Sequence, residues 1–337
     1  MKKKLLKPPD NDKSILMIPE YNMIKNWLAN YDRIITSHQP YFFNPGVSLK
    51  FLFLDLIEAK NKKIIFLDTD TIKLVVKIPI DQTNTIAFTL VNSQEIMDNF
   101  KTPDISYIKK FLVEIEEILE NHTSIYNFYI NNFKRFKNIF IENSKKYSFL
   151  KDVLVESFLE YYRINLPVEF FSNIIKNPGY ENFTEYIIKN HNSFRKIFNE
   201  SLDIYKKEYR FRFKNFPYPK LDENELPFWI LKGNNRQRCF IKDIDKDVIL
   251  LPRSVLITTY MRLYITDIFI HGTGGANYEP LHDWIITKFF KFSPKPYCII
   301  SGTFYISNIP FRDIPYFLIS PEEIRSTLSS VIKESNH

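Results

Sequence analysis

The segment from residue 32 to residue 68 most constrains the fold of this chain. The runs "DRIITS" (32–37) and "KKIIFLD" (62–68) are short, rich in β-branched residues and bounded by polar residues, which is typical of buried strands. Residues 47–59 between them carry closely spaced apolar side chains, as a buried helix does. A further strand is expected at 85–91, "TIAFTLV". This strand, helix, strand order predicts βαβ units and an α/β fold with a parallel sheet.

The middle of the chain, 94–216, has a different period. Its first long segment places apolar residues along one face of a helix, at Ile105, Ile108, Phe111, Leu112, Ile115, Ile118 and Leu119. Further amphipathic segments are expected to be helical at 125–140, 147–162 and 194–211. We interpret 94–216 as a helical insertion or cap, and 1–93 together with 217–337 as the α/β core.

Short strands return after the proline-rich turn 216–227. "FWILK" (228–232) and "QRCFIKDI" (237–244) flank "GNNR", a turn that favours a hairpin. An apolar helix (255–270), a second helix (281–290) and a strand (297–303) are expected to follow. The core sheet is therefore expected to be completed from both ends of the chain.

Charge and cysteine content exclude several classes of protein. The net charge of +7 comes from 46 basic residues against 39 acidic ones, with no long block of one sign, so we interpret it as general basicity. Cys239 and Cys298 have no CxxC spacing, which argues against a disulfide framework or a zinc cluster. The basic start lacks the apolar region of a signal peptide, and the longest apolar stretch, 255–270, is too short to span a bilayer. We expect a cytoplasmic protein with no membrane segment.

The loop "SHQPYFFNPG" (37–46) is the first candidate site. It follows the first expected strand and opens a helix, where open α/β sheets bind ligands and where backbone N–H groups favour an anion. His38 and Gln39 are expected to point into this crevice, Gly46 to permit close backbone approach, and Lys50 to reach a phosphate. The alternative is a turn that its prolines hold, with His38 a paired side chain of the core.

Two acids follow the second expected strand, Asp68 and Asp70. At the end of a strand they could hold Mg²⁺, bind a substrate amine, or act as a base and its orienting partner. The alternative, and the commoner case, is a solvated turn in which Asp acts as a cap.

The loop "HGTGGANYEP" (271–280) contains three of the seven glycines of the chain: Gly272, Gly274 and Gly275. This concentration indicates unusual backbone angles or a close approach that no side chain allows. Such a loop can form an anion-binding nest of N–H groups beside His271. The GxxxxGK[ST] pattern is absent, and Glu279 would repel an anion. The alternative is a tight turn between helices with a glycine C-cap.

Arg253 and Arg262 lie in an otherwise apolar stretch, and a buried arginine needs a partner. The partner is either Asp267 or another carboxylate at the sheet edge, or a substrate carboxylate or phosphate. His271, His282 and Asp283 are residue types that can bind metal, but the spacing of the two histidines matches no usual zinc pattern. We therefore predict no metal site from these residues.

At these loops the sequence resembles known families. "TSHQPYFFNPGVSLK" followed by "IIFLDTD" resembles the opening of the WbqC-like family, with its strand, His-Gln-Pro loop and Asp-containing second strand. The same layout is similar to the opening of the bacillithiol-synthesis cysteine-adding enzymes (BshC-like). The segment "LLPRSVLITTYMRLYITDIFIHGTGGANYEPLHDWIITKFF" also resembles the late part of that second family's core. Together these motifs cover about a third of the chain, near its two ends.

The resemblance implies a Rossmann-like (nucleotidyltransferase-like) core that carries a large helical insertion. It also implies an enzyme of the ligase or transferase class that joins an amino acid or amine to a sugar-derived or carboxylic acceptor. His38-Gln39-Pro40 replaces the glutamine pair of the cysteine-adding enzymes, and the middle is short for their coiled coil. Neither cysteine as the substrate nor dimerisation through a coiled coil is therefore part of the prediction.

In this hypothesis each predicted site residue has a role. His38 and Lys50 would stabilise charge on the leaving group, and Asp68 or Asp70 would position or deprotonate the amine. His271, with Gly272, Gly274 and Gly275, would close the other side, and Gln39, Gly46 and Arg262 would bind the substrate. The sequence leaves open whether ATP or ADP, with or without Mg²⁺, takes part, and whether the chain forms oligomers.

The alternative function is nucleic-acid binding through "YRFRFKNF" (209–216). Its aromatic residues alternate with Arg210, Arg212 and Lys214, as stacking platforms alternate with phosphate contacts. The simpler interpretation, which we prefer, is an edge strand or a helix end with basic residues that face solvent.

Overall fold

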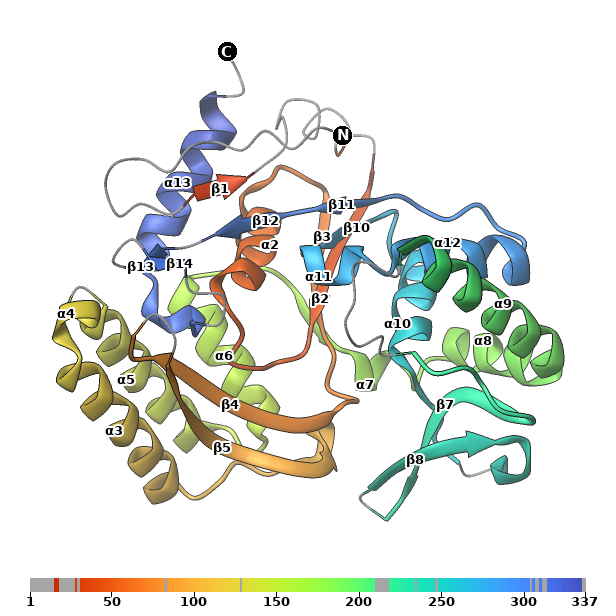
Figure 1. Cartoon of the computed structure of the whole chain (residues 1–337), viewed down its shortest axis with the longest axis horizontal. Coiled ribbons are helices and arrows are strands. Elements are labelled where there is room, and N and C mark those ends of the chain that lie inside the picture. The colour runs from red at the N-terminus through yellow and green to blue at the C-terminus, as the bar shows by residue number, and fades with distance from the viewer. Residues whose placement is uncertain are drawn as a thin grey trace.

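A computed structural model describes residues 15–17, 28, 31–81, 84–127, 129–209, 218–233, 235–245, 248–303, 305–306, 309–310 and 314–334. It shows a mixed α/β protein with a five-stranded parallel sheet in the order β11-β10-β2-β3-β6 (Figure 1). The strands are β2 (Arg33–His38), β3 (Asn61–Phe66), β6 (Val168–Phe170), β10 (Ile268–His271) and β11 (Tyr297–Ile299). Thr36 of the central strand pairs with Ile64 on one side and Ile270 on the other. The sheet thus takes β2 and β3 from the first part of the chain, β6 from its middle, and β10 and β11 from its last part.

Both faces of this sheet are buried. Successive side chains of a strand point to opposite faces, so each strand contributes side chains to two hydrophobic cores. Ile34, Ile64 and Ile270 belong to a core with the helices α2 (Pro45–Leu56), α3 (Ile105–Asn121), α5 (Ile130–Lys146) and α6 (Leu150–Tyr162). Ile35, Ile65 and Phe269 belong to a second core with α8 (Pro178–Lys189), α9 (His191–Tyr209), α10 (Ser254–Tyr260) and α12 (Glu279–Ile285). Figure 1 shows α3, α5 and α6 on one side of the molecule and α8, α9 and α12 on the other.

Two antiparallel sheets lie beyond the carboxyl ends of the parallel strands. One is the hairpin of β4 (Thr71–Pro79) and β5 (Thr85–Ile96), which follows β3 directly. The other is built from β7 (Glu225–Lys232), β8 (Asn235–Phe240) and β9 (Leu251–Pro252), as the turn "GNNR" predicts for its first two strands. Strands β5 and β8 are in contact, so the two sheets meet (Figure 1).

The structure corrects three predicted elements. The strand at 85–91 is not part of a βαβ unit, because it pairs antiparallel with β4, which the sequence pattern does not predict. The predicted helix 255–270 ends with the π-helical segment η4 (Met261–Ile265), and its last residues form β10. Strand β6 lies within the range 94–216 and pairs with β3, so this range contributes to the sheet as well as helices.

The remaining elements complete the description of the fold. Helix α13 is held to α2 by Arg325, whose Nη2 donates to Asp55 Oδ2 at 2.7 Å. No helix in the described ranges combines the length and the apolar character that crossing a membrane requires. The remaining bounds are β1 (Ile15–Met17), η1 (Met97–Asn99), α4 (Thr123–Tyr126), α7 (Phe171–Ile174), η3 (Ile241–Asp243), α11 (Thr273–Ala276), η5 (Ile286–Phe290), β12 (Ser301–Thr303), β13 (Tyr305–Ile306), β14 (Ile309–Pro310), η6 (Tyr316–Leu318) and α13 (Pro321–Glu334).

Candidate functional site

The candidate site lies where the chain changes direction through the parallel sheet. From β2 the chain proceeds to β3 and then to β6, whereas β10 and β11 are added on the opposite side of β2. The loops that leave β2 and β10 therefore diverge, which opens a crevice at the carboxyl ends of the two strands, and open α/β sheets bind ligands at such a point.

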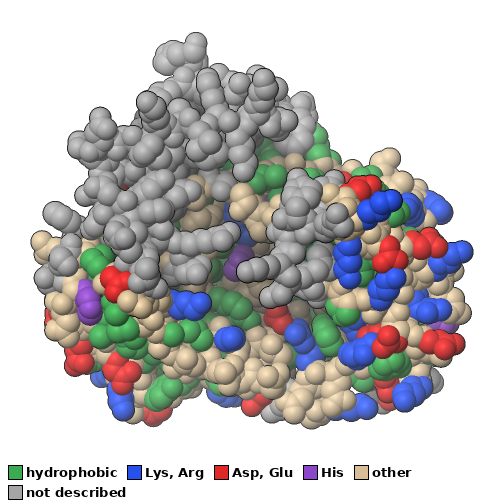
Figure 2. Space-filling view, in the orientation of Figure 1, with side chains coloured by type: hydrophobic (Ala, Val, Ile, Leu, Met, Phe, Trp, Pro, Cys, Tyr) green, Lys and Arg blue, Asp and Glu red, His purple; other side chains and the backbone are tan. Residues whose placement is uncertain are grey.

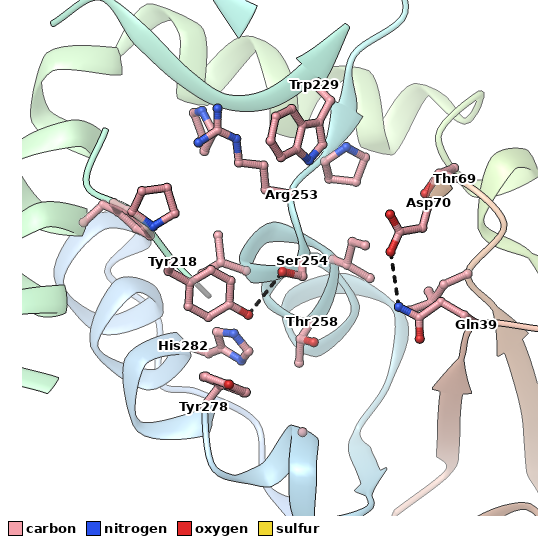
Figure 3. A pocket seen from close by; sticks show the side chains of 18 of the residues that line it. Gln39, Thr69, Asp70, Tyr218, Trp229, Arg253, Ser254, Thr258, Tyr278 and His282 are labelled. Carbon is pink, nitrogen blue, oxygen red and sulfur yellow. Dashed lines mark hydrogen bonds between the residues drawn. The ribbon is translucent and has the colours of Figure 1, made fainter. Parts of the chain in front are cut away.

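A cavity of about 320 Å³ occupies this position. One wall is formed by Gln39 and Asp70, which follow β2 and β3, and another by His271, which ends β10. The remaining lining includes Trp229 and Arg236 of the β7-β8 hairpin. It also includes side chains at the starts of α10 and α12 and within these helices (Figure 3), namely Arg253, Ser254, Thr258, Tyr278 and His282. The cavity is thus shared by the parallel sheet, the hairpin and the second core.

Glu279, at the start of α12, gathers three basic side chains in the floor of this region. Its carboxylate is fully buried, with Oε2 paired to Arg262 and Oε1 in contact with both His271 Nε2 (2.6 Å) and His282 Nδ1 (3.0 Å). Burial alone would raise the pKa of Glu279, but the neighbouring His282 and His271 hold it well below its usual range. Glu279 is therefore ionised at neutral pH and fixes the orientation of both imidazoles.

His282 combines an oriented imidazole with a free nitrogen. A carboxylate can only accept hydrogen bonds, so the proton of the neutral ring lies on Nδ1, towards Glu279, and Nε2 carries the lone pair. Nε2 has no hydrogen-bond partner among the described residues, although the side chain is buried. Figure 3 shows the ring on the cavity wall next to Tyr278 and below Tyr218. This is the arrangement of a general base.

Asp70 lies in the cavity wall as predicted, but its carboxylate is already bonded. Its Oδ1 accepts from Arg236 Nη1 at 2.5 Å and from the Thr71 backbone N–H at 2.9 Å. Its Oδ2 accepts a long hydrogen bond of 3.4 Å from Gln39 Nε2 (Figure 3). Asp70 therefore holds Arg236 and Gln39 at the cavity, and its charge is largely compensated.

Of the residues that the sequence assigns to a site, four line this cavity: Gln39, Asp70, His271 and Gly275. The others do not line it: His38, Gly46, Lys50, Asp68, Arg262, Gly272 and Gly274. Arg262 is almost fully buried and pairs with Glu279 and with Asp283, at 2.7 Å for the latter. Asp267, the partner considered for it, instead pairs with Arg33 at 2.8 Å.

Asp68 belongs to a buried network that holds the end of β3 to the helices α6 and α7. It is fully buried and accepts hydrogen bonds from Lys151 Nζ (2.8 Å), the Ser172 backbone N–H (2.8 Å) and Ser172 Oγ (2.6 Å). Lys151 also bonds Asp98 at 2.5 Å. All the contacts of Asp68 are internal, so the geometry fits an anchor between elements better than a side chain that meets a substrate.

His38 lies on the other side of the same loop. Lys50 lies near both cavities, since burial and then its charge lower the pKa of His38, and its charge adds to the effect of burial in lowering the pKa of His271. His38 lines a second cavity of about 310 Å³, between the loop, the start of α2 and strand β4, where Lys73 and Lys77 also lie. Burial, and then the charge of Lys50, lower the pKa of His38 to about 3. Lys50 is buried and donates to the carbonyl of Ser37 at 2.5 Å, without a carboxylate in ion-pair range among the described residues. Burial lowers its pKa to about 7.

The burial of Lys50 predicts a specific dependence of stability on pH. The pKa of this lysine is about 7 in the folded chain, against an ordinary value of 10.5. Between these values the unfolded state binds the proton and the folded state does not, so stability rises with pH through this window. From about pH 7.5 to about pH 10 the wild type should gain about 3 kcal/mol more free energy of unfolding than Lys50→Met. Urea unfolding of both proteins at several pH values measures this difference, and parallel curves would contradict it.

The glycine-rich loop after β10 owes little to unusual backbone angles. Within the described residues, Gly233 is the glycine with a positive φ, at 61°, so the expectation of such angles at Gly272, Gly274 and Gly275 is wrong. The expectation of a close approach holds at Gly275, where a Cβ would lie 2.7 Å from His271 Nδ1. At Gly272 and Gly274 a Cβ would meet open space.

This difference gives a matched pair of variants. Gly275→Ala should push the His271 ring away from Glu279 and destabilise the fold by about 1–3 kcal/mol, as overpacking does. Gly274→Ala, one residue away and unobstructed, should change the free energy of unfolding by less than about 1 kcal/mol. Thermal and urea unfolding of the two variants tests this contrast, and equal losses would show that the approach to His271 is not tight.

The alternative sites from the sequence have little support in the described residues. No group of three or more His, Cys, Asp or Glu side chains in the described ranges is placed to hold a metal ion. Residues 210–216 of the basic and aromatic segment lie outside the described residues. Figure 2 shows Lys and Arg side chains interspersed with Asp and Glu over the described part of this face, without a large patch of one sign.

The sequence does not predict most of the cavity wall, nor the orientation of the His282 imidazole. It suggests His282 only as a metal ligand, yet Glu279 and His282 are three residues apart, a spacing that places two side chains on one face of a helix. Trp229 and Tyr218 carry no such signal, since long-range packing of the hairpin brings them to the sheet edge.

Comparison with known proteins adds no relative from which to infer a function. No protein-family model matches this chain, and the curated proteins contain no match either. The resemblance to the WbqC-like and cysteine-adding families therefore rests on the motifs at the two ends, and the function is argued from the site.

Proposed function

We propose that this protein is an enzyme that forms a C–N bond, joining an amino acid or amine to a sugar-derived or carboxylic acceptor in the cavity at the carboxyl ends of β2, β3 and β10. We also propose that its parallel sheet is a Rossmann-like, nucleotidyltransferase-like core, which the helices on both faces and the change of direction at β2 support. The observation that carries the proposal is His282, a residue of the cavity wall whose Nδ1 is held by Glu279 and whose Nε2 has no hydrogen-bond partner in the described part of the chain.

The chemistry needs a base because an amine that attacks carbon must lose a proton. The nitrogen lone pair of the amine forms the new bond to the acceptor carbon, and the bond from that carbon to its leaving group breaks with the electron pair going to the leaving group. His282 Nε2 takes the proton that the nitrogen loses. The resulting imidazolium is stabilised by the ionised carboxylate of Glu279 on its other nitrogen.

The remaining walls suit an organic substrate with an apolar body. Tyr218, Trp229 and Tyr278 provide aromatic surface, and Ser254 and Thr258 provide hydroxyl groups (Figure 3). Binding sites for small molecules are commonly apolar clefts with a few oriented polar groups. A carboxylic acceptor would need ATP or ADP with Mg²⁺ to supply its leaving group, whereas a nucleotide-activated sugar already carries one.

A product screen by mass spectrometry tests this proposal. Wild type and His282→Asn are incubated with a panel of amino acids and primary amines, paired with carboxylic acids in the presence of ATP and Mg²⁺ or with nucleotide-activated sugars. We expect one pair to yield a product with the mass of the amine plus the acceptor, less the leaving group and the proton that the amine loses. Under the same conditions His282→Asn should yield at least about a hundredfold less of this product. Hydrolysed acceptor as the only product, unaffected by added amine, would contradict C–N bond formation.

A further inference from the structure

The charged side chains of the cavity wall do not all compensate one another. Asp70 and Arg236 form an ion pair with 2.5 Å between Oδ1 and Nη1. Arg253, which lies immediately before α10, is the other cation of the lining apart from the histidines. The guanidinium group of Arg253 is therefore the candidate in this wall for binding a charged group of a ligand.

Arg253 is held rigidly but is only partly satisfied. Its side chain is buried, and its Nη2 donates to Glu225 Oε1 at 2.5 Å. The guanidinium carbon lies 4.4 Å from the ring centroid of Trp229. The Nε–H, also buried, has no hydrogen-bond partner among the described residues. A buried N–H donor without a partner costs free energy, so its presence in a cavity wall points to a ligand that accepts from it.

Glu225 does not accept a hydrogen bond from every donor of Arg253, because its carboxylate oxygens also accept from other groups. Arg238 donates to both of its oxygens, and the Asp222 backbone N–H donates to Oε2 at 2.8 Å. Neither Arg238 nor Glu225 is part of the cavity lining, and the side chain of Glu225 is fully buried. Arg238 also pairs with Asp222 Oδ2 at 2.5 Å, so two carboxylates serve the two arginines. What Arg253 offers to a ligand is therefore its Nε–H, a donor without a partner among the described residues.

We propose that the cavity contains an anion-binding subsite at Arg253, which takes a carboxylate or phosphate group of the acceptor. This inference rests on the proposed function in that it names the chemical class of the acceptor. The anion lies against the Nε–H of Arg253, beside Trp229. In Figure 3 the Ser254 and Tyr218 hydroxyl groups lie between this end of the cavity wall and His282. The reacting end of the substrate then extends towards His282. The acceptor is anchored at one end of the cavity and reacts at the other.

Three small probes with the same ring test the subsite directly. Benzoate, phenyl phosphate and the uncharged benzamide are titrated into wild-type protein by calorimetry, without an amine or a nucleotide. We expect both anions to bind at least about tenfold tighter than benzamide, since a charge-assisted hydrogen bond is stronger than a neutral one. The tighter of the two anions identifies the acidic group of the acceptor. Equal affinities for all three probes would overturn the proposal.

Two matched variants locate the binding. Arg253→Gln and Arg238→Gln each remove one of the two arginines bonded to Glu225, but only the first removes a cation from the cavity. Arg253→Gln should lose at least about tenfold in affinity for the anions with little change for benzamide, and Arg238→Gln should bind the anions like wild type. Anion binding that survives Arg253→Gln would place the site elsewhere.

A fluorescence measurement keeps the test decisive if a variant fails to fold. Trp229 lies against Arg253, so an anion bound there should change tryptophan emission in the wild type, and this change should be absent in Trp229→Phe. An identical change in both proteins would overturn the assignment. None of these titrations involves turnover, so the subsite can be present while the product screen is negative, or absent while it is positive.

Discussion

Replacing His282 with asparagine is expected to lower kcat by about 10²- to 10⁴-fold, the usual contribution of a general base. The amide of the new side chain can still donate a hydrogen bond to Glu279, so the fold should survive, but it has no basic lone pair that could take the proton of an amine. The kcat and KM of wild type and His282→Asn, with thermal unfolding of both, measure this. A low pH limb in the rate profile of the wild type, absent in the variant, would identify the titrating base.

The matched control is His38→Asn, because His38 lines the other cavity. The sequence hypothesis assigns charge stabilisation to His38, whereas the geometry places the reaction at His282. We expect His38→Asn to keep kcat within about threefold of wild type, an effect far below that of losing a general base. The reverse result, a large loss with His38→Asn and a small one with His282→Asn, would move the site to the second cavity.

Replacing Glu279 with glutamine is expected to have the largest effect on stability. Arg262 is 1% exposed, and without Glu279 it keeps only Asp283 as a charged partner among the described residues. Removing one partner of a buried ion pair costs about 3–5 kcal/mol, since the remaining charge is left uncompensated. Activity should fall as well, because a neutral amide beside His282 Nδ1 no longer stabilises the imidazolium that forms when Nε2 takes a proton. Urea unfolding gives the change in the free energy of unfolding.

An exposed ion pair provides a control for the stability effect of Glu279→Gln, and the pH dependence of that effect provides a second test. Glu322→Gln removes an exposed pair with Arg135 and should cost less than about 1 kcal/mol. The pKa of Glu279 is depressed in the folded chain, so its contribution is fully present above its ordinary pKa of 4.5 and is lost as pH falls below that value. The difference in the free energy of unfolding between wild type and Glu279→Gln should therefore become smaller at acidic pH. A small effect at neutral pH would show that Arg262 is compensated in another way.

The sequence predicts the sheet well where strands are short and separated by turns. It identifies β2, β3 and β11, and it places Gln39 and Asp70 at the same edge because the carboxyl ends of parallel strands meet there. It does not separate β10 from the preceding helix, since an apolar run without polar alternation is compatible with either structure. Strand β6 has only three residues, too few for a period.

The sequence predicts which residues lie at the candidate site better than it predicts the direction in which their side chains point. Asp68 and Asp70 are two residues apart after β3, yet Asp68 turns inward to Lys151 and Ser172 and Asp70 lies in the cavity wall. Whether an acid at this position turns inward or faces the cavity depends on its contacts with α6 and α7, which lie far along the chain. Arg253 is expected from the sequence to meet a carboxylate or a substrate, and it contacts Glu225, in a hairpin that sequence spacing does not place near it.

A crystal structure of His282→Asn with the amine and acceptor identified by the product screen would locate the reaction, because this variant should bind both substrates and consume them at least about a hundredfold more slowly than wild type. We expect the amine nitrogen within hydrogen-bonding distance of residue 282, with the acceptor in the same cavity at the carboxyl ends of β2, β3 and β10. Both substrates in the cavity beside His38 and Lys73 instead would contradict the proposed site.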